Sequence, residues 1–253
     1  MSLLQKFLYS TFIINKMGIT PTSFNAEREL FKKLKINYEG LSLCELGNQK
    51  FTFKRQSGKQ YYLSLGVNHV SLDLNGKDGA IPLDLDVDIP KSFSNKFEVV
   101  TDYGTIEHVN NQYGVFKNVH NLCKEKGVMI HVLPHVKSPN AVSERYYFSQ
   151  EFMEGLAKKN GYKILELEIY KDPPLENSKT WVIRTVFFKT KNTPFVSKNE
   201  FESIRGVRDS GNLRFTGNYE RKLSNGVVWY LRVLRNPKNI KRKLSEIFSK
   251  RKN

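Results

Sequence analysis

The chain has 253 residues, of which 39% are hydrophobic and 12% aromatic. This many large apolar side chains exclude a disordered chain, and two cysteines are too few for a disulfide scaffold of this size. No run approaches the ~18 apolar residues that a membrane-spanning helix needs. The net charge of +16 indicates a polyanionic partner, which could be nucleic acid, an anionic membrane surface or an acidic glycan.

The positive charge is concentrated near the C-terminus. Eleven of the sixteen net charges lie after residue 204, and residues 235–253 contribute seven of them. Four apolar residues of this last segment repeat at the spacing of one helix face. They are Ile240, Leu244, Ile247 and Phe248. Such a basic amphipathic helix could pack on its own domain, lie on an anionic membrane, or flank a polyanion site.

The N-terminal residues 3–14 form an apolar stretch that polar residues interrupt. Because no small-residue cleavage site follows, we expect an amphipathic helix on the main domain rather than a signal peptide. Cys44 falls in a predicted strand and Cys123 in a predicted helix. Both are expected to be reduced core thiols, which is typical of a cytoplasmic protein.

Strands and helices are expected to alternate from residue 40 to residue 190. A first helix should start near Thr22, Ser23 and Asn25, which precede an apolar face. Strands are predicted at 40–47, 69–73, 97–102, 128–133, 162–169 and 181–189, and helices at 57–66, 112–126 and 150–160. The early strands are short, apolar and end in Asp or Gly. This pattern favours an α/β fold with a parallel sheet covered on both faces.

Acidic residues lie near the ends of three predicted strands, at Glu45, Asp73 and Asp102. Ligands of open parallel sheets bind beyond the carboxyl ends of the strands. A carboxylate that follows the second strand suits a ribose diol, because it can accept two hydroxyl hydrogen bonds. The glycine-rich phosphate-binding motifs are absent, since Gly47 is followed by Gln49 rather than by a second glycine. A nucleoside without phosphate is therefore compatible with this rim.

In their order and spacing, residues 43–189 resemble the class I S-adenosylmethionine-dependent methyltransferases. The segment Leu43-Cys44-Glu45-Leu46-Gly47-Asn48-Gln49 takes the place of the family's first motif, with Gln49 instead of its second glycine. Asp73 stands where the family has its ribose-binding acid, and Asp84-Leu85 where it contacts adenine. Residues 99–109, which end in Glu107-His108-Val109, resemble the motif after the fourth strand. Residues 45–49 and 75–79 together are similar to a subgroup often encoded near polysaccharide genes.

The resemblance implies a Rossmann-like fold with a mostly parallel seven-stranded sheet and helices on both faces. It suggests an N-terminal helical cap at 1–38, a cofactor-binding core at 39–192 and a basic C-terminal extension at 193–253. The implied cofactor is S-adenosyl-L-methionine. Its expected binding residues are Glu45, Gly47, Asn48, Gln49, Asp73, Leu74, Asp84, Leu85, Asp102, Tyr103 and Gly104.

A sugar hydroxyl is a poor nucleophile at neutral pH, so methyl transfer to it needs a general base. His108, beside Glu107, is the first candidate for this base, and His135 is the second. His131 and His120 lie inside a predicted strand and helix, where packing residues are expected. Glu107, His108 and His135 could instead hold a divalent metal, as in metal-dependent glycan methyltransferases.

The leading hypothesis is therefore an O-methyltransferase that acts on a sugar, a glycan or a related small-molecule hydroxyl. One alternative is an RNA methyltransferase that uses the basic C-terminus to hold phosphates. Another is a non-catalytic binding module, because the Gln49 side chain could narrow the cofactor cavity; equally, its amide could bond the cofactor. The expected location is cytoplasmic, with the C-terminus allowing peripheral membrane binding. The sequence does not indicate an oligomeric state.

Overall fold

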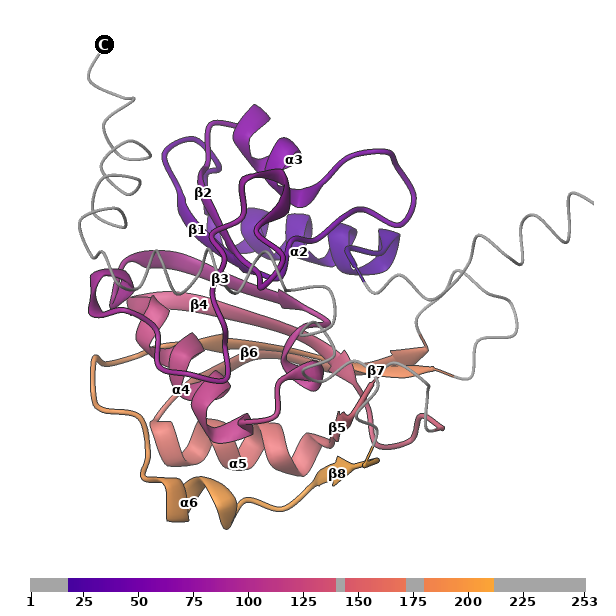
Figure 1. Ribbon diagram of the computed structural model, residues 1–253, viewed down its shortest axis with the longest axis vertical. Coiled ribbons are helices and arrows are strands. Elements are labelled where there is room, and N and C mark those ends of the chain that lie inside the picture. The colour runs from indigo at the N-terminus through magenta and orange to yellow at the C-terminus, as the bar shows by residue number, and fades with distance from the viewer. Residues whose placement is uncertain (1–17, 140–143, 172–179, 212–253) are drawn as a thin grey trace, which may run out of the picture.

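The computed structural model describes residues 18–139, 144–171 and 180–211. Six strands of this part form one sheet in the order β2-β1-β3-β4-β7-β6, and β5 and β8 form a separate two-stranded sheet (Figure 1). The strands of the large sheet are β1 (Ser42–Leu46), β2 (Asn68–Leu72), β3 (Phe97–Tyr103), β4 (Cys123–Pro134), β6 (Lys163–Lys171) and β7 (Trp181–Phe188). The small sheet pairs β5 (Tyr146–Phe148) with β8 (Val207–Asp209).

The expectation of a mostly parallel, Rossmann-like sheet is confirmed. The pairs β1–β2, β1–β3 and β3–β4 are parallel, whereas β7 is antiparallel to both of its neighbours. The described residues give this sheet six strands rather than the expected seven. At the β2 edge, the chain adds a single parallel bridge between Leu72 and Ile81 instead of a further strand.

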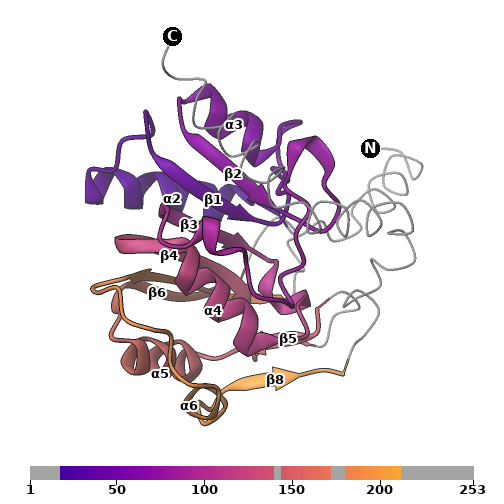
Figure 2. The same cartoon turned by 60° about the vertical axis from the view of Figure 1, so that its left-hand side comes forward.

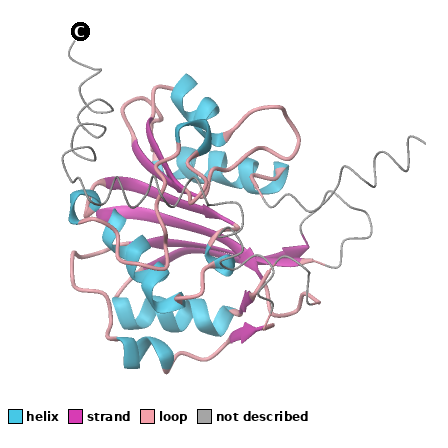
Figure 3. Ribbon diagram, in the orientation of Figure 1, coloured by secondary structure: helices cyan, strands magenta, loops and turns pink. Residues whose placement is uncertain are grey.

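Helices cover both faces of the sheet (Figures 1 and 2). Helices α2 and α3 lie on one face, and α4, α5 and α6 lie on the other (Figures 1 and 3). Their bounds are α2 (Pro21–Leu34), α3 (Gly58–Ser64), α4 (Gln112–Leu122), α5 (Gln150–Asn160) and α6 (Lys198–Glu202). Short 3-10 helices follow β2 at Lys77–Gly79, precede β3 at Lys91–Phe93 and follow β3 at Ile106–His108, the last being η3.

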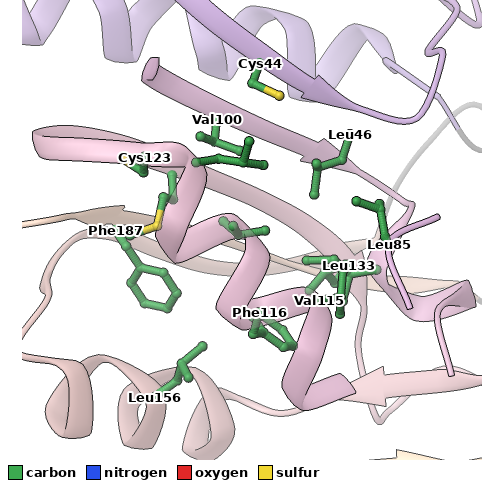
Figure 4. Close-up of a cluster of buried hydrophobic side chains, with 14 of the residues drawn as sticks. Cys44, Leu46, Leu85, Val100, Val115, Phe116, Cys123, Leu133, Leu156 and Phe187 are labelled. Atoms are coloured by element: carbon green, nitrogen blue, oxygen red, sulfur yellow. The ribbon is translucent and has the colours of Figure 1, made fainter. Parts of the chain in front are cut away.

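The two faces bury two hydrophobic clusters because successive strand residues point in opposite directions. Leu43 and Val99 belong to the cluster that contains α2 residues, whereas Cys44 and Val100 belong to the cluster under α4 and α5. Figure 4 shows this second cluster, to which α4 contributes Phe116 and α5 contributes Leu156. Both cysteines are buried free thiols, as expected.

Helix α2 begins earlier than the sequence suggested. Its N-cap is Thr20, whose hydroxyl accepts a hydrogen bond from the Ser23 amide at 3.2 Å, and the Ser23 side chain accepts in return from the Thr20 amide. Pro21 occupies the first turn, where its missing N–H costs no hydrogen bond. This reciprocal capping, rather than a cap at Thr22 or Asn25, sets the start of the helix.

Helix α4 is shorter than predicted, and the prediction that Cys123 is helical is wrong. The helix ends at Leu122, and Cys123 already pairs with Phe97 as the first residue of β4. Two hydrogen bonds and one backbone conformation explain this end. The buried ammonium of Lys189 donates to the carbonyls of His120 and Cys123, at 2.8 Å each, and Lys126 has a left-handed φ of 61°. These features turn residues 123–127 into a bulged strand.

The described parts of both flanking segments pack on the core. Leu30 and Phe31 of α2 join one cluster, and Phe201 of α6 joins the other. The proposed divisions at residues 38/39 and 192/193 stay predictions. The apolar stretch 3–14 and the helix expected at 240–248 lie outside the described residues. Within residues 18–139, 144–171 and 180–211, no helix is long and apolar enough to cross a membrane.

Candidate cofactor and active site

The strand order reverses between β1 and β3. The chain leaves β1 to form β2 on one side and then returns to form β3 on the other side. In an open α/β sheet, ligands bind at such a reversal, beyond the carboxyl ends of the strands. Most of the cofactor residues expected from the sequence lie on the turns that follow β1, β2 and β3. Topology therefore brings these turns to one edge of the sheet.

Asp73, directly after β2, ties two of these turns together. One oxygen of its carboxylate accepts a hydrogen bond from the Asn48 amide at 2.7 Å, and the other accepts from the Asn75 amide at 2.8 Å. The side chain is only partly buried. Since an ionised carboxylate can accept about four hydrogen bonds, Asp73 keeps capacity for hydroxyl donors. Asn48 and Asp73, both expected to bind a cofactor, are thus adjacent.

The Gln49 side chain fills the space beside Gly47. Gly47 has a left-handed φ of 77°, and a Cβ there would lie 2.6 Å from both the Gln49 amide nitrogen and the Thr105 hydroxyl. The Gln49 amide donates to Thr105 Oγ1 at 2.9 Å and to the Leu46 carbonyl at 3.2 Å. Thr105 Oγ1 in turn donates to Leu46 at 3.0 Å. These bonds bridge the ends of β1 and β3, a role of Thr105 that sequence reasoning missed.

Glu45 faces α3 rather than the open edge of the sheet. Its side chain is fully buried, with one oxygen 3.5 Å from His69 Nε2 and the other under Gly58, where a Cβ would clash with it. Burial raises the pKa of Glu45, and the nearby His69 opposes that shift. The Glu45 side chain therefore lies in the interior, where it supports the turn after β1 instead of facing the edge of the sheet.

Three further residues expected to bind the cofactor follow β2, and they differ in exposure. Asp84 is partly exposed, and its Oδ1 accepts from the Asp86 amide at 2.9 Å. Leu74 is also partly exposed. Leu85, in contrast, is 5% exposed and packs in the core under α4. Only Leu74 and Asp84 of this group therefore offer side chains to a ligand.

Asp102 organises the turn between β3 and η3. Its buried carboxylate accepts from the amides of Thr105 at 3.0 Å and Ile106 at 3.3 Å, and it contacts His131 Nδ1 at 3.0 Å. His131, expected to be a packing residue, is thus a polar partner of Asp102. The parallel register that pairs these two residues across β3 and β4 creates this contact.

Gly104 and Tyr103 follow Asp102 in the chain. Gly104 has a φ of 85°, which favours glycine. The Tyr103 side chain lies on the opposite face of the sheet, where its hydroxyl donates to the buried carboxylate of Glu27 in α2. Tyr103 could therefore meet a ligand at the edge only through its main chain.

Glu107 and His108 lie next to each other in η3. The Glu107 carboxyl is fully buried, and neither oxygen has a hydrogen-bond partner among the described residues. Burial raises its pKa well above the usual range, and the negative charges of Asp102 and Glu144 add to this effect. His108 Nε2 lies 3.8 Å from Glu107 Oε1, and its side chain is 18% exposed. A buried carboxyl with a raised pKa therefore lies beside a partly exposed imidazole.

His135 has a different setting, just beyond β4. It is 3% exposed, and its Nδ1 accepts from the Lys137 amide at 3.2 Å. Burial and the positive charge of Lys137 lower its pKa, so the ring is neutral near pH 7. Among the residues that the structure describes, no group of three or more His, Cys, Asp or Glu side chains is placed to hold a metal ion.

No family model and no curated protein match the chain. Several solved structures are similar to parts of the chain. A 1,6-didemethyltoxoflavin N1-methyltransferase from Burkholderia thailandensis, with S-adenosylhomocysteine bound, is 12% identical with a TM-score of 0.48, over 66% of this chain and 77% of that one. S-adenosylmethionine-dependent methyltransferases from Listeria monocytogenes (putative; 12%, TM-score 0.46) and Mesorhizobium loti (13%, TM-score 0.45) each match 64% of this chain and 97% of their own.

Proposed function

We propose that the chain is an S-adenosylmethionine-dependent O-methyltransferase that acts on a sugar, a glycan or a related small-molecule hydroxyl. The observation that carries this proposal is the place of Asp73. Its carboxylate follows β2 at the β1–β3 reversal, is held by the amides of Asn48 and Asn75, and keeps acceptor capacity. That arrangement suits the two hydroxyls of a ribose.

The residues at this edge also suit the charge of the cofactor. S-adenosylmethionine supplies a methyl group on a cationic sulfonium, which is its own leaving group. Asp73 and Asp84 are partly exposed there, and their negative charges would favour a cation. Both hydrogens of the Gln49 side-chain amide are used by Thr105 and Leu46, so this side chain would offer a bound molecule at most its carbonyl oxygen. Residues of this chain would thus bind and orient, while the cofactor brings the reactive group.

His108 is the proposed general base. It is partly exposed, and it lies 3.8 Å from the Glu107 carboxyl, whose pKa is raised by burial. A carboxyl that ionises less readily stabilises a positive charge on the imidazole less strongly, so the ring remains able to accept a proton. The role proposed for His108 is to remove the proton from the acceptor hydroxyl as the oxygen attacks the methyl group.

The test is an assay of methyl transfer from S-adenosylmethionine to simple sugars, polysaccharide fragments and RNA in parallel. Formation of S-adenosylhomocysteine with a carbohydrate, and its loss in His108→Asn, is the expected result. Turnover with RNA alone would replace the glycan assignment. No binding of the cofactor at millimolar concentration would instead favour the non-catalytic module, which the packing of Gln49 against Thr105 also supports.

A nucleic-acid acceptor is the second candidate because of the charge distribution. Eleven of the sixteen net positive charges follow residue 204. Phosphate contacts release counterions, so RNA binding through this segment would weaken steeply with salt. An anionic membrane is the alternative partner of this segment. Binding of the protein to vesicles with acidic lipids, without binding to RNA, would support that partner. We propose a cytoplasmic location, since buried free thiols suit a reducing compartment.

A further inference from the structure

Four aromatic rings from three segments gather beside the turn after β1. They are Phe24 of α2, Phe51 and Phe53 of the loop before α3, and Tyr61 of α3. The centroids of Phe24, Phe51 and Tyr61 lie 5.2–5.4 Å apart in edge-to-face pairs. Phe53 closes the group at 5.4 Å from Phe51 and 5.7 Å from Phe24.

The ammonium of Lys54 lies among these rings. Its Nζ is 3.9 Å from the centroid of Phe51, 4.4 Å from that of Tyr61 and 4.8 Å from that of Phe24. The fourth ring, Phe53, is 5.7 Å away. All four distances fall within the ~6 Å over which a ring face attracts a cation. All four rings are therefore within cation–π range of one positive charge.

Charge pairing does not explain the position of Lys54. No carboxylate forms an ion pair with it in the described part of the chain. The guanidinium of Arg28 contacts the same group of rings, 5.7 Å from the Phe24 centroid. Desolvation and this like charge lower the pKa of Lys54. The ring faces, rather than an acid, are thus the groups that favour the ammonium here.

We propose that Phe24, Phe51, Phe53 and Tyr61 form an aromatic cage that binds a methylated ammonium group, and that Lys54 is its internal occupant. A quaternary ammonium is more weakly hydrated than a primary one, so it loses less on entering such a cage. Cages of this kind are a recurrent means of recognising choline and methylated lysine. The Lys54 side chain is long and flexible, and it can leave for water when the ligand enters.

The cage is open to solvent. Phe53 is 45% exposed, Phe24 and Tyr61 are partly exposed, and only Phe51 is buried, as the floor. A purely structural cluster would bury its rings more completely, because exposing them forfeits about 25 cal/mol per Å². The cage uses none of the residues assigned to the cofactor, so this inference does not depend on the proposed methyl transfer.

The test compares the wild type with Lys54→Ala, which removes the internal competitor. Choline and N-ε-trimethyl-lysine are titrated separately by NMR, to distinguish a small-molecule source from a protein side chain. The uncharged isostere of choline, 3,3-dimethylbutan-1-ol, is the control for charge. We expect Lys54→Ala to bind at least one ammonium ligand ~10-fold more tightly than the wild type, because ligand no longer competes with an occupied state.

A second substitution keeps the test decisive. Adding Phe53→Ala to Lys54→Ala should weaken ammonium binding ~5-fold or more, as expected for one lost cation–π contact of about 1 kcal/mol. Leu63 is an exposed apolar residue of α3, the helix that carries Tyr61, and Leu63→Ala should leave ammonium binding unchanged. Lys54→Gln serves if the alanine variant does not fold. Equal binding of choline and its uncharged isostere, or no ammonium binding to either Lys54 variant at tens of millimolar, would overturn the proposal.

Discussion

The side-chain amide of Gln49 donates a hydrogen bond to Thr105 Oγ1 at 2.9 Å, across the point where the strand order reverses. The Thr105 hydroxyl in turn donates a hydrogen bond to the Leu46 carbonyl at 3.0 Å. The two side chains connect the end of β1 to the turn after β3, although 56 positions separate them in the chain. This link holds the two turns that form the candidate site in one geometry.

Thr105→Val should therefore destabilise the fold. The substitution keeps the shape of the side chain but removes the hydroxyl that joins Gln49 to Leu46. We expect a loss of about 1–2 kcal/mol in the free energy of unfolding, which corresponds to a fall of roughly 2–8 °C in Tm by calorimetry. Thr190→Val is the matched control, because its hydroxyl makes one exposed hydrogen bond to the Gly161 carbonyl. Equal losses in both variants would contradict the role given to Thr105.

Glu27 should make stability depend on pH. It is 1% exposed, and burial raises its pKa from 4.5 to about 7, although hydrogen bonds from Tyr103 and Tyr62 oppose the shift. Between these two values the unfolded chain loses the proton while the folded chain keeps it. The contribution of Glu27 to the free energy of unfolding is therefore fully present below about pH 4.5 and falls as the pH rises. Above about pH 7 the free energy of unfolding is lower by about 3 kcal/mol.

Replacing Glu27 with glutamine removes this titration. Denaturant unfolding of Glu27→Gln at several pH values should show a much flatter fall in unfolding free energy between about pH 4.5 and pH 7 than the wild type shows. Glu29→Gln changes an exposed carboxylate on the same helix and should leave the slope unchanged. A wild-type slope that survives in Glu27→Gln would show that another group causes it.

His108 and His135 should differ in their effects on turnover. His108 is accessible and lies beside Glu107, whereas His135 is buried with a lowered pKa. His108→Asn should reduce kcat by about 10²-fold or more, the usual contribution of a general base, and leave cofactor affinity unchanged. His135→Asn should have a smaller effect on kcat. The reverse order, measured by steady-state kinetics with an identified acceptor, would transfer the role of base to His135.

Local patterns in the sequence were sufficient to predict most of the large sheet. The apolar run before Gly47 and the Ser149 cap of α5 mark their elements directly, because each signal lies within the element itself. The end of α4 was missed because residues 123–126 suit a helix by composition. The pairing of Cys123 with Phe97 of β3 and the hydrogen bonds of the buried Lys189 are tertiary contacts, and these override the local preference. The three-residue strands β5 and β8 pair across about 60 positions and leave no periodic signal.

The residues of the candidate site could likewise be predicted only in part. Asp73 and Asp102 could be predicted, since they lie at the carboxyl ends of apolar strands. Their partners on other strands and turns could not be predicted, because only the tertiary fold brings them together. His131 meets Asp102 through strand register, and Thr105 meets Gln49 across the reversal point. The cage around Lys54 also depends on three separate segments, so nothing in the local sequence indicated it.

The central claim is that Asp73 holds the ribose of S-adenosylmethionine at the reversal between β1 and β3. Calorimetric titration of the wild type, Asp73→Asn and Asp88→Asn tests it most directly; Asp88 is an exposed carboxylate that pairs with Lys117 far along the chain. We predict one bound cofactor per chain for the wild type and Asp88→Asn, and affinity at least ~10-fold weaker for Asp73→Asn, since a charge-assisted pair is lost. No binding to the wild type at millimolar cofactor, or unchanged affinity in Asp73→Asn, would contradict the claim.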